Sequence, residues 1–411
     1  MKRPIRILTV GMDIVGEIDN YESMFFTRSW HGIGSIELRI NRYKKHAETL
    51  IKNNLILVGN DLNKVFIIKH REIELDQEGK ITENWLIKGY ALKSIIAQRI
   101  TMPPLHTAYD NRSGNAETVM KHYINTNVIN PVDGRRRISN LVIAPNLQRG
   151  IALAYSSRFK NLAEEMSTLS LTSGLGWDVT LDIANKKWVF DVVEGKDLTA
   201  DQIINPPVIF SPQFESVKNM QYVQSDLNYK NVGIVAGQGE GVERRVIEVG
   251  SFSGLNRHEI FIDARDVAEV DEDEMPIPEQ QVIQSLTDRG QQQLNELLQE
   301  EYLEAQLLTP ISRTEYEREF SYLSTLQISE NITKKTRTLS AFNYQLDYDL
   351  GDIATVQNKD WGVTLNARIT EVKEIEEVTG FGLEATFGNN RPTLIQKIKQ
   401  ELSQMSGEVR K

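Results

Sequence analysis

Three segments near the end of the chain alternate apolar and polar residues with a period of two, and this pattern constrains the fold most strongly. The segments are residues 349–356, 365–372 and 382–388, and each is bounded by Gly, Asn or Asp. Such alternation is typical of strands with one buried face, and the bounding residues favour turns. The sequence therefore predicts three half-buried antiparallel strands in this region.

The first hundred residues show the same period. Residues 35–40 alternate without a break, and residues 65–75 and 85–87 flank a polar stretch that is typical of a hairpin turn. Short helices are expected at residues 44–52 and 92–98. Strands that wrap on themselves around such small helices predict a compact, barrel-like unit.

A different pattern begins at Met102-Pro103-Pro104, because successive prolines break regular structure. Amphipathic helices are expected to start near Asn115 and near Ser157, where apolar residues recur at helical spacing. Residues 177–182 and 187–193 then alternate and predict a second hairpin. Helices followed by a strand pair indicate an α+β unit inserted between two β-rich regions.

The third region returns to strands. Residues 231–236 and 242–249 flank a glycine-rich turn and predict a further hairpin. An acidic tract at residues 271–274 precedes residues 279–308, whose apolar stripe predicts the longest helix of the chain. A final amphipathic helix is expected within residues 391–411.

Composition and charge exclude several classes of protein. The chain of 411 residues contains no cysteine, which rules out disulfides, thiolate metal sites and cysteine nucleophiles. Its net charge of −10 argues against a protein that grips nucleic acid over a broad basic face. No apolar run approaches the roughly 20 residues that span a bilayer. Asp13 and Glu17 interrupt the apolar N-terminus, which argues against a signal peptide, so we expect the chain to fold in a cytoplasm.

Two clusters invite a ligand-binding interpretation. Gly233, Gly237, Gly239 and Gly241 resemble a nucleotide loop, but a phosphate site needs a helix directly after the glycines, and a strand is predicted there. A hairpin turn is the better interpretation. The acidic tract 271–274 lacks the spaced ligands and central glycine of a calcium loop, which favours a solvated linker or an acidic loop facing a lumen.

No catalytic constellation stands out in the sequence. The adjacent Glu164 and Glu165 are expected on the exposed side of a helix and diverge by about 100°, so they are poorly placed as an acid/base pair. The histidines show no metal-binding spacing; they are His31, His46, His70, His106, His122 and His258. We therefore predict no catalytic, cofactor-binding or metal-binding residues, and no cofactor.

Two further groups could contact partners. The run Arg135-Arg136-Arg137 could touch nucleic acid, although a short basic run in an acidic protein is more typical of a surface loop or of the rim of a protein contact. Five tryptophans lie in or beside predicted strands, where packing explains them better than base stacking does; they are Trp30, Trp85, Trp177, Trp188 and Trp361.

Several different short motifs follow one another along nearly the whole chain. They are Ser29-Trp30 before residues 34–40, the hairpin at 65–87 with Arg99-Ile100, Asn161-Leu162-Ala163 before Gly176-Trp177, and finally Leu350-Gly351-Asp352, Arg368-Ile369 and Phe387-Gly388-Asn389. In this order they resemble the tail-hub proteins of siphophages, which are related to the baseplate hubs of contractile tails. The order over about 390 residues, rather than any single motif, carries the resemblance.

The resemblance implies an α+β, mainly β fold with two β-barrel-like tube domains, an inserted α+β domain and a long helix. Three subunits would then form a pseudo-sixfold ring, with the insertion outside and an acidic lumen that lets DNA pass. The long helix is expected on the outside of the ring. The predicted domains are residues 1–101, 102–213 and 214–390, followed by a C-terminal helix at 391–411.

The function implied is a non-enzymatic, homotrimeric structural hub in the virion tail tip, assembled in the bacterial host cytoplasm. Expected partners are the distal tail protein ring, the tape measure protein, a tip fibre or separate lysin protein, and genomic DNA passing without specific binding. Some hubs carry an appended fibre or wall-degrading domain, and this chain ends at Lys411 after one predicted helix. The alternatives are a carbohydrate- or receptor-binding β protein of the same particle and, less favoured, a hydrolase assembled from distant residues.

Overall fold

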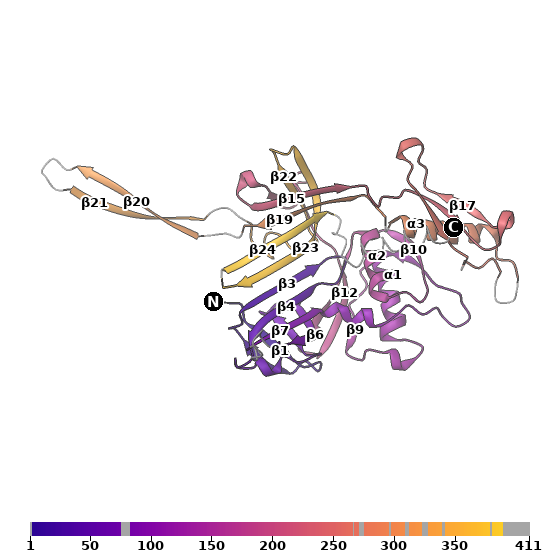
Figure 1. Cartoon of the computed structure of the whole chain (residues 1–411), viewed down its shortest axis with the longest axis horizontal. Coiled ribbons are helices and arrows are strands. Elements are labelled where there is room, and N and C mark those ends of the chain that lie inside the picture. Colours follow the sequence, from indigo (N-terminus) through magenta and orange to yellow (C-terminus); the bar gives the residue numbers. More distant parts are fainter. Residues whose placement is uncertain are drawn as a thin grey trace.

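The computed structural model describes residues 2–74, 83–265, 267–270, 275–295, 297–308, 312–322, 328–338, 342–378 and 380–388, with the backbone alone for 312–322 and 328–338. The chain is mainly β with few helices (Figure 1), so the predicted α+β, mainly β class is confirmed. The acidic tract 271–274 and the C-terminal helix expected at 391–411 lie outside the described residues. Within the described ranges, no helix combines the length and apolar character needed to cross a membrane.

The first β region consists of seven strands. These are β1 Ile5–Leu8, β2 Ile14–Ile18, β3 Ser23–Ser29, β4 Ser35–Asn41, β5 Leu55–Val58, β6 Val65–Glu72 and β7 Asn84–Ala91. β6 and β7 pair antiparallel, as the predicted hairpin requires. The helix expected at 44–52 is reduced to the 3₁₀ turn η1 (Ala47–Thr49), because His46 has a φ of 66° and ends any helix on that side. The other expected helix is the 3₁₀ segment η2 (Leu92–Gln98).

The middle region contains two α-helices and two small sheets. Its elements are β8 Asp110–Asn115, α1 Ala116–Ile124, β9 Leu141–Ile143, β10 Ala152–Ser157, α2 Leu162–Ser173, β11 Gly176–Asp182 and β12 Lys187–Val193. The two sheets are β10-β8 and β11-β12-β9. β11 and β12 form the predicted hairpin. Helix α2 begins five residues later than expected, because Ser157 closes strand β10 and the Asn161 side chain caps the helix by accepting from the Ala163 amide.

The third region runs from strand to helix and back to strand. Its elements are β15 Val217–Ser225, β16 Val232–Ala236, β17 Val246–Val249, β18 Glu259–Asp263, α3 Glu279–Asn295, β19 Glu300–Leu307, β20 Ser312–Tyr322, β21 Ile328–Thr338, β22 Ile353–Asn358, β23 Val363–Glu377 and β24 Gly380–Gly388. β22, β23 and β24 are antiparallel neighbours, as the alternating segments at the chain end predict. β20 and β21 pair as a long hairpin (Figure 1).

The long helix predicted at 279–308 is wrong in its second half. Helix α3 ends at Asn295, and β19 follows as a strand between β15 and β24. Leu303, Ala305 and Leu307 are buried in alternation, which is the period of a strand. The Glu, Gln and Leu residues of this stretch favour a helix locally, and the burial available in the sheet overrides that preference.

One sheet joins the two β-rich regions. Its main strand order is β15-β19-β24-β23-β3-β4-β7-β6-β5-β1-β2, and the contact between regions is the antiparallel pairing of β23 with β3. The sheet does not close into barrels, because β15 and β2 stand at its two ends. The structure thus replaces two expected barrel-like units with one continuous curved surface (Figure 1).

Among the residues that the structure describes, four apolar cores stabilise the fold. One lies within the first β region, and a second joins that region to the middle one, where Leu57 and Ile67 share a cluster with Tyr123 and Trp177. A third lies under β19 and β22–β24 and includes Trp30 from the first region. The fourth lies between α3 and the small sheet β17-β16-β18 and contains only residues of that unit.

Candidate functional site

Three motif segments that stand far apart in the sequence, at Gly176, Gly351 and Arg368, meet around the indole of Trp30, which follows β3 and is only 5% exposed. A Cβ added at Gly176 would lie 2.6 Å from ring atoms of Trp30, and one added at Gly351 would lie 2.1 Å from the ring. Both positions therefore require glycine for close approach. The first β region, the middle region and the last strands are all in contact with this one side chain.

Hydrogen bonds fix the indole in this three-way junction. Trp30 Nε1 donates to the Gly174 carbonyl at 3.1 Å, and the Trp30 amide donates to the Thr370 carbonyl at 2.8 Å. Arg368 donates from Nη1 to the Gly351 carbonyl at 2.5 Å, and its guanidinium lies 5.8 Å from the Trp30 ring centroid. A buried aromatic with its polar edge satisfied is a rigid joint rather than a reactive group.

Lys93 links the first region to the middle region beside the Trp30 junction. Its ammonium donates to the Ser29 carbonyl at 2.7 Å and to the Trp177 carbonyl at 3.0 Å, and it lies 4.6 Å from the Trp177 ring centroid. Full burial lowers the pKa of Lys93 to about 8. His31 accompanies it, with Nδ1 2.7 Å from Ser170 Oγ, and burial lowers the pKa of His31 to about 3, so its imidazole is neutral.

Asp352 shapes the Leu-Gly-Asp turn at the junction. Its two carboxylate oxygens accept from the Lys196 amide at 2.7 Å and from the Asp349 amide at 2.8 Å. Burial raises the pKa of this carboxyl above its usual range, although both amide bonds favour the charged form. The aspartate therefore holds the turn that presents Gly351 to the indole.

A buried ionic cluster reinforces the seam between β3 and β23. The Glu374 carboxylate is 1% exposed; its Oε2 accepts from Arg3 Nη1 at 2.5 Å, and its Oε1 forms an ion pair with Lys64 Nζ at 2.6 Å. Arg3 also pairs with Glu376, at 3.4 Å. Burial lowers the pKa of Lys64, and the neighbouring Glu374 opposes that shift. Because one carboxylate is shared by two cations from the first region, the seam is specified by charge as well as by strand pairing.

The histidines lie apart from one another on different elements. His70 lies 2.7 Å from Glu72 and His122 lies 2.8 Å from Asp110, on separate elements. In the described part of the chain, no three His, Asp or Glu side chains gather closely enough to hold a metal ion. The histidines of the sequence are not brought together.

The glycine cluster forms a hairpin, as the sequence predicts. β16 and β17 pair antiparallel on either side of it, and Gly239 and Gly241 take the positive φ values of 95° and 55° that such a turn needs. The expectation for Glu165 is wrong. It is buried on α2, 3.7 Å from Lys160, because it lies three residues after Leu162 and four before Leu169, on the buried face of the helix, whereas Glu164 is exposed. Burial raises the pKa of Glu165.

The three arginines of the basic run have different surroundings. Arg135 pairs with Asp133 at 2.8 Å, and Arg136 donates to the Ile100 carbonyl at 2.5 Å. Arg99 in turn donates from Nε to the Arg136 carbonyl at 2.8 Å, and Arg137 is exposed. The run is thus fixed on the surface of the middle region beside the chain that leaves η2.

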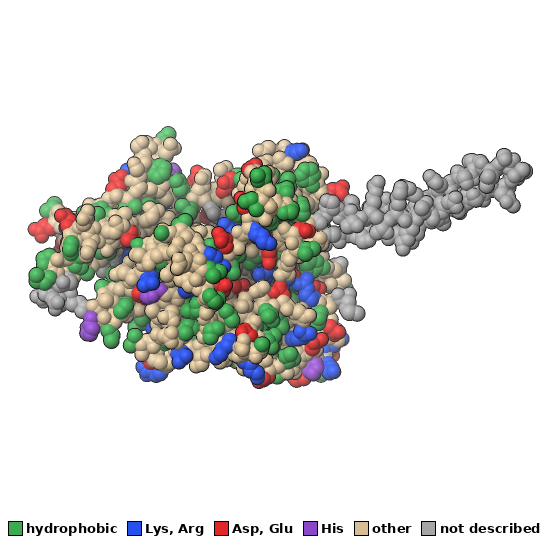
Figure 2. Space-filling model, turned by 180° about the vertical axis from the view of Figure 1, so that it is seen from behind, with side chains coloured by type: hydrophobic (Ala, Val, Ile, Leu, Met, Phe, Trp, Pro, Cys, Tyr) green, Lys and Arg blue, Asp and Glu red, His purple; other side chains and the backbone are tan. Residues whose placement is uncertain are grey.

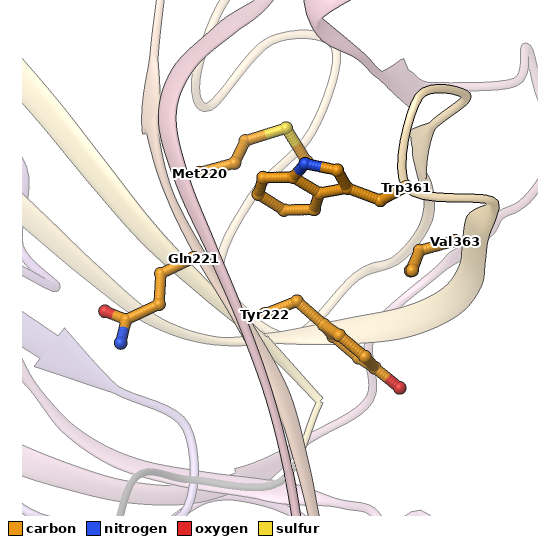
Figure 3. A pocket seen from close by; sticks show the side chains of 5 residues that line it. All are labelled: Met220, Gln221, Tyr222, Trp361 and Val363. Atoms are coloured by element: carbon orange, nitrogen blue, oxygen red, sulfur yellow. The ribbon is translucent and has the colours of Figure 1, made fainter.

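Four of the tryptophans pack inside or along the sheets, as expected, and Trp361 differs. It is 50% exposed in the turn between β22 and β23. Together with Met220, Gln221, Tyr222 and Val363 it lines a shallow open pocket (Figure 3). Figure 3 shows the Met220 side chain reaching the indole and Gln221 pointing away on the other side of β15. The sequence contains no pattern that would have identified this pocket.

Comparison with known proteins places this geometry in context. The profile of a family described as Siphovirus ReqiPepy6 Gp37-like protein matches residues 4–389. No curated protein matches the sequence.

Among solved structures, the 43 kDa tail protein of prophage MuSo2 from Shewanella oneidensis is similar, with a TM-score of 0.52, 11% identity, and coverage of 93% of this chain and 98% of that one. A tail protein from Neisseria meningitidis MC58 gives a TM-score of 0.49 at 10% identity, covering 95% and 97% of the two chains. Prophage tail protein gp18 from Listeria monocytogenes EGD-e gives 0.47 at 12% identity, covering 98% and 99%. At such identities, the likeness to the Shewanella protein shows a shared fold.

Proposed function

The chain belongs to the family of Siphovirus ReqiPepy6 Gp37-like proteins, a family of phage tail structural proteins, and from this premise we propose that it is a tail-tip or baseplate hub. As a tail protein it is a component of the virion. In the proposal, three copies form a ring that continues the tail tube and surrounds the channel for DNA ejection. The hub itself carries out no catalysis.

The continuous sheet is the observation that best supports a ring. Each chain offers two β-rich regions side by side, joined by β3 and β23, so three chains supply six similar segments of wall. A threefold particle tip could in this way match a sixfold tube. The proposed tube domains are residues 1–101 and 214–390, with the inserted domain 102–213 outside the ring. Closed rings are the usual outcome of repeated contacts between identical subunits.

Charge supports passage of DNA rather than its capture. The chain carries 57 acidic and 47 basic residues, and side chains of both signs are interspersed on the face shown in Figure 2. A wall without a broad basic surface would hold phosphate weakly and would not slow transit. We propose that DNA passes without specific binding and that helix α3 faces outward.

The proposed partners follow from a position at the tail tip. The ring would contact the distal tail protein ring on one side and the tape measure protein within, and a tip fibre or separate lysin protein would complete the tip. Assembly would take place in the host cytoplasm.

Copy number and position test the proposed function. The purified protein should give the mass of a trimer by light scattering, and cryo-microscopy of the particle should place three copies around an axial channel at the tip. A stable monomer at high concentration, or a position away from the channel axis, would contradict the proposal.

The exposed aromatic pocket favours one alternative, a carbohydrate-binding or receptor-binding role. Tyr222 and Trp361 offer apolar ring faces beside each other at the surface, as sugar-binding sites do (Figure 3). Binding of host cell-wall glycan, lost on Trp361→Ala and kept on Trp85→Ala, would establish this role. Absence of binding at millimolar glycan would remove it.

A further inference from the structure

A strongly basic part of this acidic chain lies on the middle region. Residues 99–160 contain nine Lys and Arg against three Asp and Glu, although the whole chain has a net charge of −10. Two strands of chain cross there, since the Phe159 amide donates to the Thr101 carbonyl and the Thr101 amide donates to the Lys160 carbonyl, each at 2.8 Å. We define the basic patch as Met102 and Phe159 with the surrounding cations Arg99, Arg137, Arg158 and Lys160.

Phe159 is the unusual member of the basic patch. Its side chain is 51% exposed, and its backbone has a φ of 53°, a left-handed conformation that a phenylalanine adopts at a cost. Arg158 lies over its ring, with Cζ 5.0 Å from the centroid. Strain retained at an exposed apolar residue is typical of a binding site, because folding alone would favour glycine or a polar residue there.

A stretch of opposite charge occurs elsewhere in the same chain. Residues 226–299 contain fifteen Asp and Glu against six Lys and Arg, which accounts for nearly the whole net charge. The described residues of this stretch form a unit inserted at the end of the β15–β19 pair, where Ser225 faces Glu300, and the unit has its own core. In Figure 1 this unit, with α3 and β17, lies beside the middle region and away from β1.

The acidic unit presents an apolar residue at its tip. The turn between β16 and β17 carries Val242, whose side chain is fully exposed, between the exposed Glu240 and Glu243. We define residues 239–243 as the acidic knob. An apolar side chain flanked by carboxylates fits a surface of exposed Met102 and Phe159 surrounded by cations, in both charge and hydrophobicity.

We propose that the acidic knob of one copy docks on the basic patch of a second copy. The contact is head-to-tail, so it repeats around a ring and closes when the rotation fits the number of subunits. It lies outside the channel wall and supplies a second belt of contacts. The inference rests on the self-association in the proposed function and adds the surfaces that meet.

The absence of cysteine makes the test direct. One preparation carries Met102→Cys and another Val242→Cys, and the two are mixed under mild oxidation, so that only contacts between copies can form the disulfide. We expect a disulfide-linked dimer at least tenfold above the yield obtained when Ile203→Cys replaces Val242→Cys. Ile203 is the matched control, because its side chain is equally exposed at 99%. High salt before oxidation should reduce the yield, since the contact is charged.

The outcomes separate this inference from the proposed function. If the mixed cysteine variants form trimers but no disulfide between residues 102 and 242, the docking contact is overturned and the proposed hub function stands. A disulfide without trimers would support the contact and contradict the ring. Equal disulfide yields with the Ile203 control would overturn the proposal in favour of random collision. Binding of the chain to vesicles of one part anionic to three parts neutral lipid, lost on Arg158→Glu, would overturn it in favour of a membrane surface.

Phe159→Gly provides a second measurement. It removes the strained apolar side chain, so the disulfide yield should fall several-fold while the melting temperature stays the same or rises. A merely structural Phe159 would give the reverse, a lower melting temperature with an unchanged yield. That result would overturn the role assigned to this residue.

Discussion

Replacing Gly351 by alanine should destabilise the Trp30 junction far more than the same change at Gly362. Both glycines have positive φ, 95° at Gly351 and 65° at Gly362. A Cβ at Gly362 meets nothing within 4 Å, whereas a Cβ at Gly351 would lie 2.1 Å from Cζ3 of Trp30. Gly362→Ala therefore measures the cost of positive φ alone, and Gly351→Ala adds a collision with the indole.

The two costs can be estimated separately. A left-handed conformation costs an L-residue about 1–2 kcal/mol more than glycine. Extra atoms forced into a packed core add about 1–3 kcal/mol, and the upper end applies because hydrogen bonds to Gly174 and Thr370 hold the indole in place. We expect the free energy of unfolding to fall by about 1 kcal/mol for Gly362→Ala and by about 3–4 kcal/mol for Gly351→Ala.

Urea denaturation followed by circular dichroism measures both losses, and a double-mutant cycle isolates the contact. In a Trp30→Ala background, Gly351→Ala should cost no more than Gly362→Ala, because the ring that it strikes is absent. Equal losses at the two glycines in the native background would refute the reasoning. So would an unchanged cost of Gly351→Ala after removal of the indole.

Three further changes test other parts of the structure. The folded-state pKa of Lys93 lies near 8, below that of an exposed lysine, so the unfolded chain binds more protons than the folded chain between about pH 8 and 10. The free energy of unfolding should therefore rise with pH over this range. Lys93→Met should abolish the rise in urea titrations at pH 7, 8.5 and 10. Glu374→Gln should lower the free energy of unfolding by about 3–5 kcal/mol, because it leaves the buried Lys64 and the partly buried Arg3 without this carboxylate. Glu384→Gln, in an exposed pair with Lys373, should cost less than about 1 kcal/mol. Equal effects of the two substitutions would show that the seam is not specified by charge. Leu303→Ala in β19 should lower the free energy of unfolding by about 2–5 kcal/mol in the same assay. Leu298→Ala, at a side chain that is 53% exposed, should lower it little. A large effect at Leu298 would argue for a continuous helix.

Local pattern was sufficient where each strand buries one face. Period-two alternation predicts the terminal strands β22, β23 and β24 and the hairpin β11–β12 directly, because alternate residues of a strand face opposite sides of the sheet. β19 was missed because its Glu, Gln and Leu residues favour a helix when neighbours are ignored. Its alternation at Leu303, Ala305 and Leu307 was present but weaker than the helical signal.

The junction itself could not be predicted from pattern. Trp30 and Gly351 are more than 300 residues apart, and nothing at either position indicates the other. The motifs were recognised as an ordered set, and only the fold shows that Gly176, Gly351 and Arg368 lie against Trp30. Glu165 was misplaced for a different reason, because a carboxylate normally favours the exposed face, although its spacing from Leu162 and Leu169 puts it on the buried one.

The pairing of β3 with β23 has a consequence for synthesis on the ribosome. β3 lies between β4 and β23 in the sheet, so its second edge has no neighbour until roughly 350 further residues have emerged. At translation speeds of about 5–20 residues per second, this interval lasts on the order of 20–70 s. A bare strand edge exposed for so long invites pairing with another nascent chain. Cells that produce this protein in quantity should therefore need chaperone protection for its N-terminal third, and slowing translation should raise the insoluble fraction.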